Sequence, residues 1–315
     1  MGLVWNEVGA AMIPYLIATL CVVVIFTLAG LALNLQWGMG GLVNFGLFGF
    51  YMLGAYICGL LVVRLELSPL VAMSIAIVAT GAISALVSLI SIRLSEDYLA
   101  IVTLGFAECI RLFISYEDWL TFGTLGVSGI TRPFAGLVPV QWNDILFVAF
   151  AICALAVVYV TLTLISASPF GRLMRATRDD PDIVSSLGRS VLTIRLRSFA
   201  LGGAILGLAG SLHAFYYGYI DPTQFTPIIT AYAFMVVVVG GRGSNPGVLL
   251  AAFVLVFLLE GSRFLVDYVP GLDGATLASL RLIAVGVALV VLLIVKPGGF
   301  GRERPTLRIS HNSQT

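Results

Sequence analysis

The feature that most constrains this chain is a series of long apolar stretches that contain almost no charge. An α-helix needs roughly 20 apolar residues to cross a hydrocarbon core about 30 Å thick. Seven windows meet that length, at 12–33, 43–63, 70–92, 143–166, 198–217, 246–266 and 276–295. Two more, 98–115 and 228–240, are shorter or more polar and could span, re-enter or break. We therefore expect an all-α polytopic membrane protein with eight to ten transmembrane or re-entrant segments.

The composition of the chain excludes a soluble protein, and the pattern of its apolar stretches excludes a membrane β-barrel. Hydrophobic residues make up 59% of the chain and charged residues only 10%, against about 25% charged in soluble proteins. Membrane β-barrels are built from roughly 10-residue strands of alternating polarity, whereas these stretches are long and do not alternate. No Lys or Arg precedes the first apolar stretch, so we expect that helix to be retained rather than cleaved as a signal peptide.

Basic residues indicate which loops face the cytoplasm. Of the 17 Lys and Arg residues, six lie in 167–197, and four more lie near the C-terminus at Lys296, Arg302, Arg304 and Arg308. The positive-inside rule therefore places the 167–197 loop and the 297–315 tail in the cytoplasm. Counting the crossings backwards places 116–142 and the N-terminus outside. The net charge of +1 gives no indication of a nucleic-acid partner.

The 167–197 loop contains two predicted short helices. After Pro169, apolar residues recur at three- and four-residue spacing, with Arg172, Arg175 and Arg178 on the flank. Such a helix can lie at the membrane interface, with its arginines turned to headgroups or to an acidic partner. Asp180 then predicts an N-cap, and a glycine eight residues later predicts the end of a second helix of about two turns.

This second helix is too short to span a membrane, yet it carries an apolar stripe at Ile183, Val184 and Leu187. A loop that merely joins two spans and obeys the charge rule would also be basic, and this alternative stays open. A simple connector has no need of a capped helix with an exposed apolar stripe, whereas a helix that docks in a groove of another protein does. The pattern therefore favours a docking helix.

Glycine-rich segments interrupt the apolar sequence twice, at 38–41 and at 240–247. Breaks at membrane depth are tolerated where protein or water satisfies the freed backbone, and paired breaks often flank the path of a transporter. Ordinary tight turns at the membrane surface are the alternative. Polar side chains near both breaks favour a path. The candidate path residues are Asn34, Asn44, Thr103, Gly240, Gly241, Arg242 and Asn245.

The other polar residues in the apolar windows have structural explanations. Glu108 and Arg111 stand three apart on one helical face and can neutralise each other, and Glu260 and Arg263 repeat that spacing. His213 lies among tyrosines at a predicted helix end, as in an interfacial aromatic belt. The four cysteines lack metal-ligand or disulfide spacing and are expected to be buried. Neither a metal site nor an enzyme motif is indicated.

A family resemblance covers most of residues 30–265. The central run of the chain is SPFGRLMRATRDDPDIVSSLGRSVLTIRLRSFALGGAILGLAGSLHAFYYGYIDPTQF. It resembles the loop region of permease subunits of branched-chain amino acid ABC importers, and among these it is most similar to the M-type permease. Three further stretches support the resemblance in family order: GMGGLVNFGLFGFYMLGAY, SEDYLAIVTLGFAECIRL and MVVVVGGRGSNPGVLLAA.

The resemblance implies that residues 1–315 form a single permease domain with glycine-broken helices and that 181–188 is a coupling helix seated on an ATPase. The residues it assigns to coupling are Arg172, Arg175, Asp182, Ile183, Val184, Leu187 and Gly188. Many ABC permeases carry Glu-Ala-Ala followed by a glycine after three residues. This chain keeps the acidic start and the glycine, but Ser185 and Ser186 stand where alanines are usual.

The expected function is therefore one half of an alternating-access path for branched-chain or other amino acids. The implied partners are a second homologous permease, two cytoplasmic ATPases that bind ATP-Mg, a periplasmic or lipid-anchored substrate-binding protein, and the lipid of a bacterial cytoplasmic (inner) membrane. The chain itself is expected to hold no cofactor and to be no enzyme, because its single lysine, Lys296, has no Walker context. A secondary transporter or channel for small polar solutes and a membrane scaffold stay open as alternatives.

Overall fold

The computed structural model describes residues 2–90, 96–136, 139–265 and 299–301, and the single positions 276, 279, 283, 286, 287, 290, 291 and 294. The main helices are α1 (Gly2–Leu33), α2 (Leu47–Arg64), α3 (Pro69–Ile90), α4 (Glu96–Tyr116), α6 (Val140–Ala167), α9 (Val191–Tyr217), α10 (Pro227–Gly240) and α11 (Asn245–Leu265). The shorter elements are η1 (Asn34–Met39), α5 (Asp118–Thr121), η2 (Gly123–Leu125), β1 (Val127–Ser128), α7 (Pro169–Asp179), α8 (Pro181–Ser186), β2 (Tyr219–Ile220) and η3 (Pro222–Gln224).

The described helices confirm an all-α polytopic membrane protein. Seven segments are long and apolar enough to cross a bilayer: α1, α2, α3, α4, α6, α9 and the stretch from η3 through α10. The apolar part of α11, Asn245–Glu260, is shorter. The sequence left open whether residues 98–115 form an unbroken helix, and in the structure they lie within the continuous helix α4. Most of the 276–295 window and of the 297–315 tail lies outside the described residues, so the total number of spans stays a prediction.

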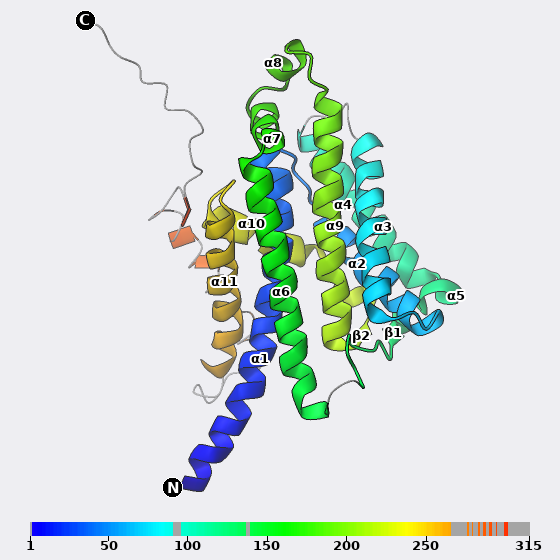
Figure 1. Ribbon diagram of the computed structural model, residues 1–315, viewed down its shortest axis with the longest axis vertical. Helices are drawn as coiled ribbons and strands as arrows, with labels where there is room; N and C mark the ends of the chain where they lie inside the picture. The colour runs from blue at the N-terminus through cyan, green and yellow to red at the C-terminus, as the bar shows by residue number, and fades with distance from the viewer. Residues whose placement is uncertain are drawn as a thin grey trace, which may run out of the picture.

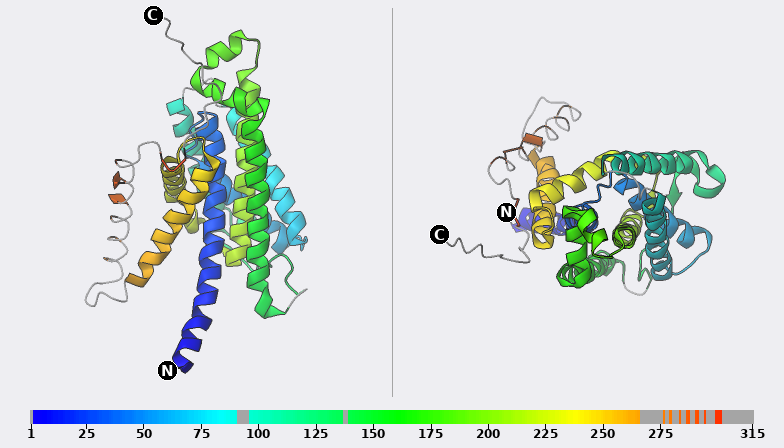
Figure 2. Two further views of the ribbon diagram at one scale, coloured as in Figure 1. Left: turned by 60° about the vertical axis from the view of Figure 1, so that its left-hand side comes forward. Right: turned by 90° about the horizontal axis from the view of Figure 1, so that it is seen from above.

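Helix α9 lies at the centre of the bundle, packed against α2 and α3 on one side and against α1 on another (Figures 1 and 2). Helix α1 in turn packs against α6, α10 and α11. The two-residue strands β1 and β2 pair antiparallel where the chain leaves α9. This arrangement makes α9 and α1 the axis around which the other described helices gather.

Glycines on α9 allow this close packing. A Cβ on Gly203 would lie 2.3 Å from Ser84 Cβ of α3, and one on Gly210 would lie 2.1 Å from the Tyr51 carbonyl oxygen of α2. Small residues four apart let membrane helices approach to backbone contact, where dispersion and weak polar contacts drive association. The spacing of Gly203 and Gly207 is such a pattern, and it was visible in the sequence but was not recognised there.

Replacing Gly54 with alanine is expected to destabilise the bundle, because the new Cβ would lie 2.5 Å from Gly207 Cα, a backbone atom of α9. Overpacking of this kind costs about 1–3 kcal/mol. The measurement is the thermal unfolding midpoint of the detergent-purified protein. Gly105→Ala on α4 is the matched control, since nothing lies within 4 Å of its Cβ position. An equal midpoint for both variants would contradict the close α2–α9 contact.

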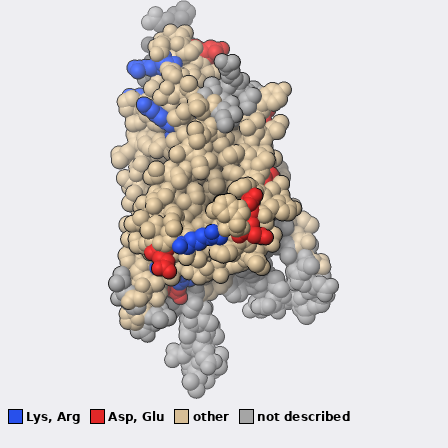
Figure 3. All heavy atoms as spheres, turned by 90° about the vertical axis from the view of Figure 1, so that its right-hand side faces the viewer, with Lys and Arg blue, Asp and Glu red and all other residues tan. Residues whose placement is uncertain are grey.

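The two ends of the bundle differ. Helices α7 and α8 extend from one end, whereas α5, β1, β2 and the N-terminal end of α1 lie at the other (Figure 1). Figure 3 shows charged side chains gathered toward the two ends of one face, with a largely uncharged band between them. Such a band matches the hydrocarbon core of a bilayer, where charged side chains are costly. Following the expectations from the sequence, we call the α7–α8 end the coupling end and the opposite end the outer end.

Intramembrane polar residues partly follow the sequence expectations. Glu108 and Arg111 form the expected ion pair, with Arg111 Nε 2.8 Å from Glu108 Oε2. The side chain of Arg263 lies outside the described set, so the second expected pair stays a prediction. The expectation that all four cysteines are buried is wrong for two of them, because Cys109 and Cys153 are exposed on α4 and α6. Both lie on outward faces of apolar helices, where a thiol is compatible with lipid.

Candidate functional site

The coupling end is built from two helices that are each closed by a side-chain cap. The Ser168 hydroxyl accepts a hydrogen bond from the Gly171 amide (3.3 Å) at the start of α7, with Pro169 in the first turn. Asp180 caps α8, accepting from the amides of Asp182 (2.9 Å) and Ile183 (3.1 Å). The N-cap predicted from the sequence is therefore confirmed. Caps of this kind fix where short helices begin.

Helix α8 ends at the predicted glycine and presents apolar side chains to the outside. Gly188 has φ +74°, the left-handed conformation that favours glycine after a helix end. Ile183 is 59% exposed and Leu187 is 75% exposed. The expectation that Val184 belongs to the same exposed stripe is wrong, because Val184 is buried in the hydrophobic core and anchors α8 to it. The candidate docking surface is therefore Ile183, Leu187 and the exposed carboxylate of Asp182 beside them.

Helix α7 packs onto the protein rather than resting freely at an interface. Its Met174 and Thr177 are buried, which corrects the interpretation of this apolar face as a membrane-surface face. Arg172 is exposed and donates to the Ala167 carbonyl (3.2 Å). Arg175 turns inward and donates to the Ser166 carbonyl (3.1 Å). These bonds tie the start of α7 to the end of α6.

Arg178, at the end of α7, reaches the first helix break. Its guanidinium donates from Nη1 to the Gly38 carbonyl over 2.5 Å. A Cβ on Gly41 would lie 2.8 Å from Arg178 Cγ, so the glycine is required for the arginine stem to lie against this backbone. The side chain of Arg178 is only 19% exposed. Helix α7 thus touches the break directly, a contact that no local sequence signal predicted.

The two predicted helix breaks meet inside the molecule. The first, predicted at 38–41, is the end of η1, a π-helical continuation of α1, and the second is the turn between α10 and α11. Asn34 Nδ2 donates to Asn245 Oδ1 (3.0 Å), and the Gly243 amide donates to Asn34 Oδ1 (2.8 Å). A Cβ on Gly38 would lie 2.8 Å from that same Gly243 amide nitrogen. Asn34 and Asn245 are both buried, so the two breaks pack against each other inside the protein. Whether they lie at membrane depth or at the membrane surface stays a prediction.

A second buried polar cluster holds the other side of η1. Asn44 Nδ2 donates to Gln36 Oε1 (2.8 Å), while Thr103 Oγ1 accepts from the Phe45 amide (3.1 Å) and donates to the Ala100 carbonyl (3.0 Å). Thr103 and Asn44 are both fully buried. In the described part of the chain, Asn44 Oδ1 has no hydrogen-bond partner. Thr103 thus satisfies the backbone amide of Phe45 next to the first break, whereas Asn44 bonds to a side chain of η1 and, among the described residues, keeps one buried acceptor oxygen unpaired.

The glycines and the arginine of the second break have distinct roles. Gly240 packs against the start of α11, where a Cβ would lie 2.6 Å from the Val248 amide nitrogen. Gly241 has φ +92°, so the turn itself favours glycine. Arg242 is exposed and stacks over the Trp37 ring of η1, with 4.2 Å from Cζ to the ring centroid. Such a cation–π contact is a further link between the two breaks.

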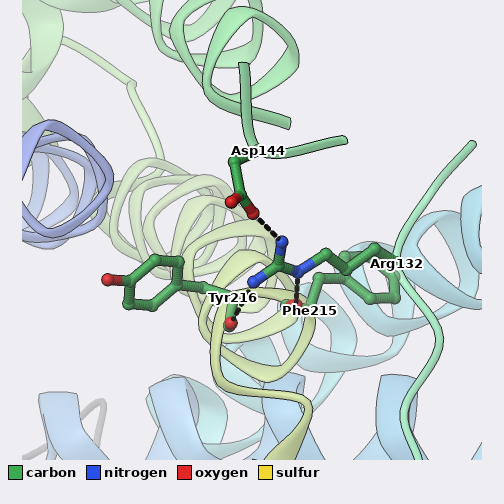
Figure 4. Close-up of polar contacts among 4 residues, drawn as sticks. All are labelled: Arg132, Asp144, Phe215 and Tyr216. Atoms are coloured by element: carbon green, nitrogen blue, oxygen red, sulfur yellow. Dashed lines mark hydrogen bonds and ion pairs between the residues drawn. The ribbon is translucent and has the colours of Figure 1, made fainter. Parts of the chain in front are cut away.

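The outer end contains a polar cluster that sequence reasoning missed. Arg132 donates to the carbonyls of Phe215 (3.1 Å) and Tyr216 (3.0 Å) at the C-terminus of α9, and it pairs with Asp144 of α6 (Figure 4). A cation is favoured at this position because the C-terminal carbonyls of a helix carry partial negative charge. Arg132 and Asp144 are twelve residues apart in a predicted loop and helix start, so no helical spacing pointed to the pair.

His213 is part of a partly buried hydrogen-bonded chain. Tyr51 Oη lies 2.7 Å from His213 Nδ1, and Gln224 Oε1 lies 3.1 Å from His213 Nε2. An amide oxygen can only accept, so Nε2 carries the proton and Nδ1 accepts from the tyrosine hydroxyl. The exposed Tyr217 beside it fits the expected interfacial aromatic belt. His213 itself does not, because it is less exposed and is hydrogen-bonded on both ring nitrogens. The histidine links α9 to α2 and to the η3 turn.

A bundle of apolar spans with two helix breaks meeting inside it, and a capped helical extension at one end, defines a multi-pass membrane permease. The chain belongs to the family described as "Branched-chain amino acid transport system / permease component", whose model matches residues 15–296. The family membership expected from the sequence is therefore confirmed.

Named relatives agree with this membership. The chain is 32% identical to the high-affinity branched-chain amino acid transport system permease protein LivM of Escherichia coli K12, over 94% of the chain and 72% of the relative. It is 27% identical to the probable LivM of Methanocaldococcus jannaschii, over 90% and 92%. It is 25% identical to LivH of Salmonella typhimurium LT2, over 73% and 79%. No solved structure matches the chain.

These likenesses confirm the transport-permease class and the resemblance to the M-type subunit. The identity to proteins named LivM exceeds the identity to proteins named LivH, and both kinds of permease are related to this chain.

Proposed function

We propose that this chain forms one half of the translocation path of an ATP-driven importer for branched-chain or related amino acids. The observation that carries the proposal is a continuous line of contacts at the coupling end. It runs from the exposed Ile183 and Leu187 of α8, through α7, to the Arg178 bond on the Gly38 carbonyl. From there the Asn34–Asn245 pair connects one helix break to the other.

The proposed mechanism follows from these contacts. Two cytoplasmic ATPase subunits bind ATP-Mg and grip the docking surface on α8, and their closure moves α7 as a rigid piece. Arg178 passes the displacement to Gly38 at the end of η1, where the helix stops. Small displacements become discrete rearrangements when packed elements have two alternative arrangements. The paired breaks are the element proposed to switch between outward- and inward-facing states.

The proposed setting is a bacterial cytoplasmic membrane with the coupling end inside. A homologous second permease completes the path, and a periplasmic or lipid-anchored binding protein delivers the substrate to the outer end. No nucleotide is proposed to bind to this chain. A secondary transporter would couple to an ion through an unpaired intramembrane acid, and Glu108, an acidic residue of α4, is paired with Arg111. That pairing favours the ATP-driven mechanism.

Uptake of labelled leucine tests the proposal. Membrane vesicles from cells that express this chain with its partner subunits, loaded with ATP and supplied with binding protein, are expected to accumulate leucine. Vesicles without the chain, or vesicles that hold a non-hydrolysable ATP analogue, should not accumulate it. Accumulation driven by an ion gradient in the absence of ATP would instead establish the secondary transporter.

A further inference from the structure

A cavity of about 290 Å³ lies at the outer end between α1, α6 and α9. Ile17 and Ala18 of α1 and Phe147 of α6 form its apolar walls, and Arg132 and Asp144 form its polar wall. Small-molecule sites are typically concave and mostly apolar, with a few placed polar groups that fix orientation. The cavity has this composition, and its volume suits a small solute.

The polar wall has unused binding capacity of both signs. Arg132 has five N–H donors, and three of them are occupied by the carbonyls of Phe215 and Tyr216 and by Asp144 Oδ1. These bonds hold the guanidinium plane in place (Figure 4). Among the contacts of the described residues, one hydrogen on each terminal nitrogen remains, as does the second carboxylate oxygen of Asp144, whose side chain is 61% exposed. A guanidinium held by two backbone carbonyls and an exposed carboxylate paired with it therefore stand side by side at one edge of an apolar cavity.

The geometry points to a binding site for a zwitterionic α-amino acid with an aliphatic side chain. The α-carboxylate accepts from the free N–H groups of Arg132, and the α-ammonium donates to Asp144. The side chain lies against Ile17, Ala18 and Phe147. A solute with only one of the two charges could contact only one of the two wall groups, and would lose the other polar contact. The inference rests on the proposed function, because the transport of amino acids supplies this class of ligand.

The position of the cavity fits a site of first entry. It lies at the outer end, to which a binding protein is proposed to deliver substrate. Tyr217 lines both this cavity and a second one of about 360 Å³, which contains Tyr51, His213 and Gln224. The two cavities therefore adjoin at Tyr217, and the second lies against α2 and α10, whose C-terminal end carries one of the helix breaks. Substrate held at Arg132 and Asp144 is thus next to the interior of the bundle.

Protection of an introduced thiol tests the site. A cysteine-free form of the chain carrying Ala18→Cys is expressed with its partner subunits, and spheroplasts are washed free of soluble binding protein. The rate of labelling by N-ethylmaleimide is then measured with leucine, with 4-methylpentanoate, which lacks the ammonium group, or with isoamylamine, which lacks the carboxylate. Leucine is expected to slow labelling, and the two single-charge analogues are expected to have little effect. Equal protection by all three, or no protection by millimolar leucine, would overturn the site.

Two further variants separate binding from folding. Leu125→Cys, in an exposed turn at the same end, should be labelled at the same rate with and without leucine. Asp144→Asn keeps the size and the acceptor for Arg132, and it should raise the half-protecting leucine concentration roughly five- to tenfold. An unchanged concentration would remove Asp144 from the site. Labelling needs neither ATP nor binding protein, so a negative result here leaves the uptake test of the proposed function standing.

Discussion

Replacing Ile183 and Leu187 together with aspartate is expected to abolish ATP-driven uptake while leaving the permease folded. Both side chains are exposed in this chain, so their loss costs it little burial. In the proposed complex each would bury its side chain in the ATPase, at about 1.5–3 kcal/mol. Losing both side chains and burying carboxylates in their place is therefore expected to weaken the affinity of the permease for the ATPase by at least about a hundredfold. The measurements are leucine uptake and recovery of ATPase with the tagged permease.

The matched control places the same substitution at the opposite end. Leu125 is 81% exposed in the turn near β1, and Leu125→Asp should leave ATPase recovery unchanged. A third variant, Val184→Asp, buries a charge in the core and is expected to unfold the loop, which separates loss of docking from loss of structure. Full ATPase recovery with the double variant would contradict the assignment of α8 as the docking helix.

Arg178→Ala is expected to uncouple the importer: ATPase subunits still bind and hydrolyse ATP, but uptake falls at least tenfold. The substitution removes the bond to the Gly38 carbonyl and the packing against Gly41, so α7 loses its direct contact with the broken helix. Docking through α8 is untouched. The measurement is the ratio of leucine transported to ATP hydrolysed. Arg178→Lys retains a charged donor without the guanidinium geometry. Its ratio of leucine transported to ATP hydrolysed should lie between those of the unmodified chain and Arg178→Ala.

Arg64→Ala is the matched control for Arg178. Arg64 also donates to a backbone carbonyl, that of Trp119 at 2.6 Å, but it does so at the outer end. Arg64→Ala removes a comparable hydrogen bond but leaves the contacts that run from α8 through Arg178 to the helix breaks unchanged. The ratio of leucine transported to ATP hydrolysed should therefore be preserved. A normal ratio in Arg178→Ala, or failure of that variant to assemble with ATPase, would rule out a specific coupling role.

Local features of the site were predictable because they depend on residues a few positions apart. The Asp180 cap, the helix end at Gly188 and the two glycine breaks all follow from backbone chemistry that single residue types determine. The spans followed from bilayer thickness and apolar length. The family resemblance added the position of the coupling helix, which periodicity alone described only as a docking helix.

Long-range contacts were not predictable in the same way. That Asn34 meets Asn245 and that Arg178 reaches Gly38 depends on how distant helices pack, and no local pattern encodes it. The burial of Val184 has the same cause, since a two-turn helix shows too little periodicity to separate its inner from its outer face. Arg132 was overlooked because its partners lie on two other helices.

Site-specific photo-crosslinking in intact membranes tests the central claim most directly. A photoreactive amino acid is placed at Leu187 on α8, or at Leu125 near β1 as the equally exposed control, and the adducts are identified by mass spectrometry. We predict that Leu187 captures a polypeptide with a Walker motif and that Leu125 does not. Absence of any ATPase adduct at Leu187, in membranes that show leucine uptake, would contradict the account.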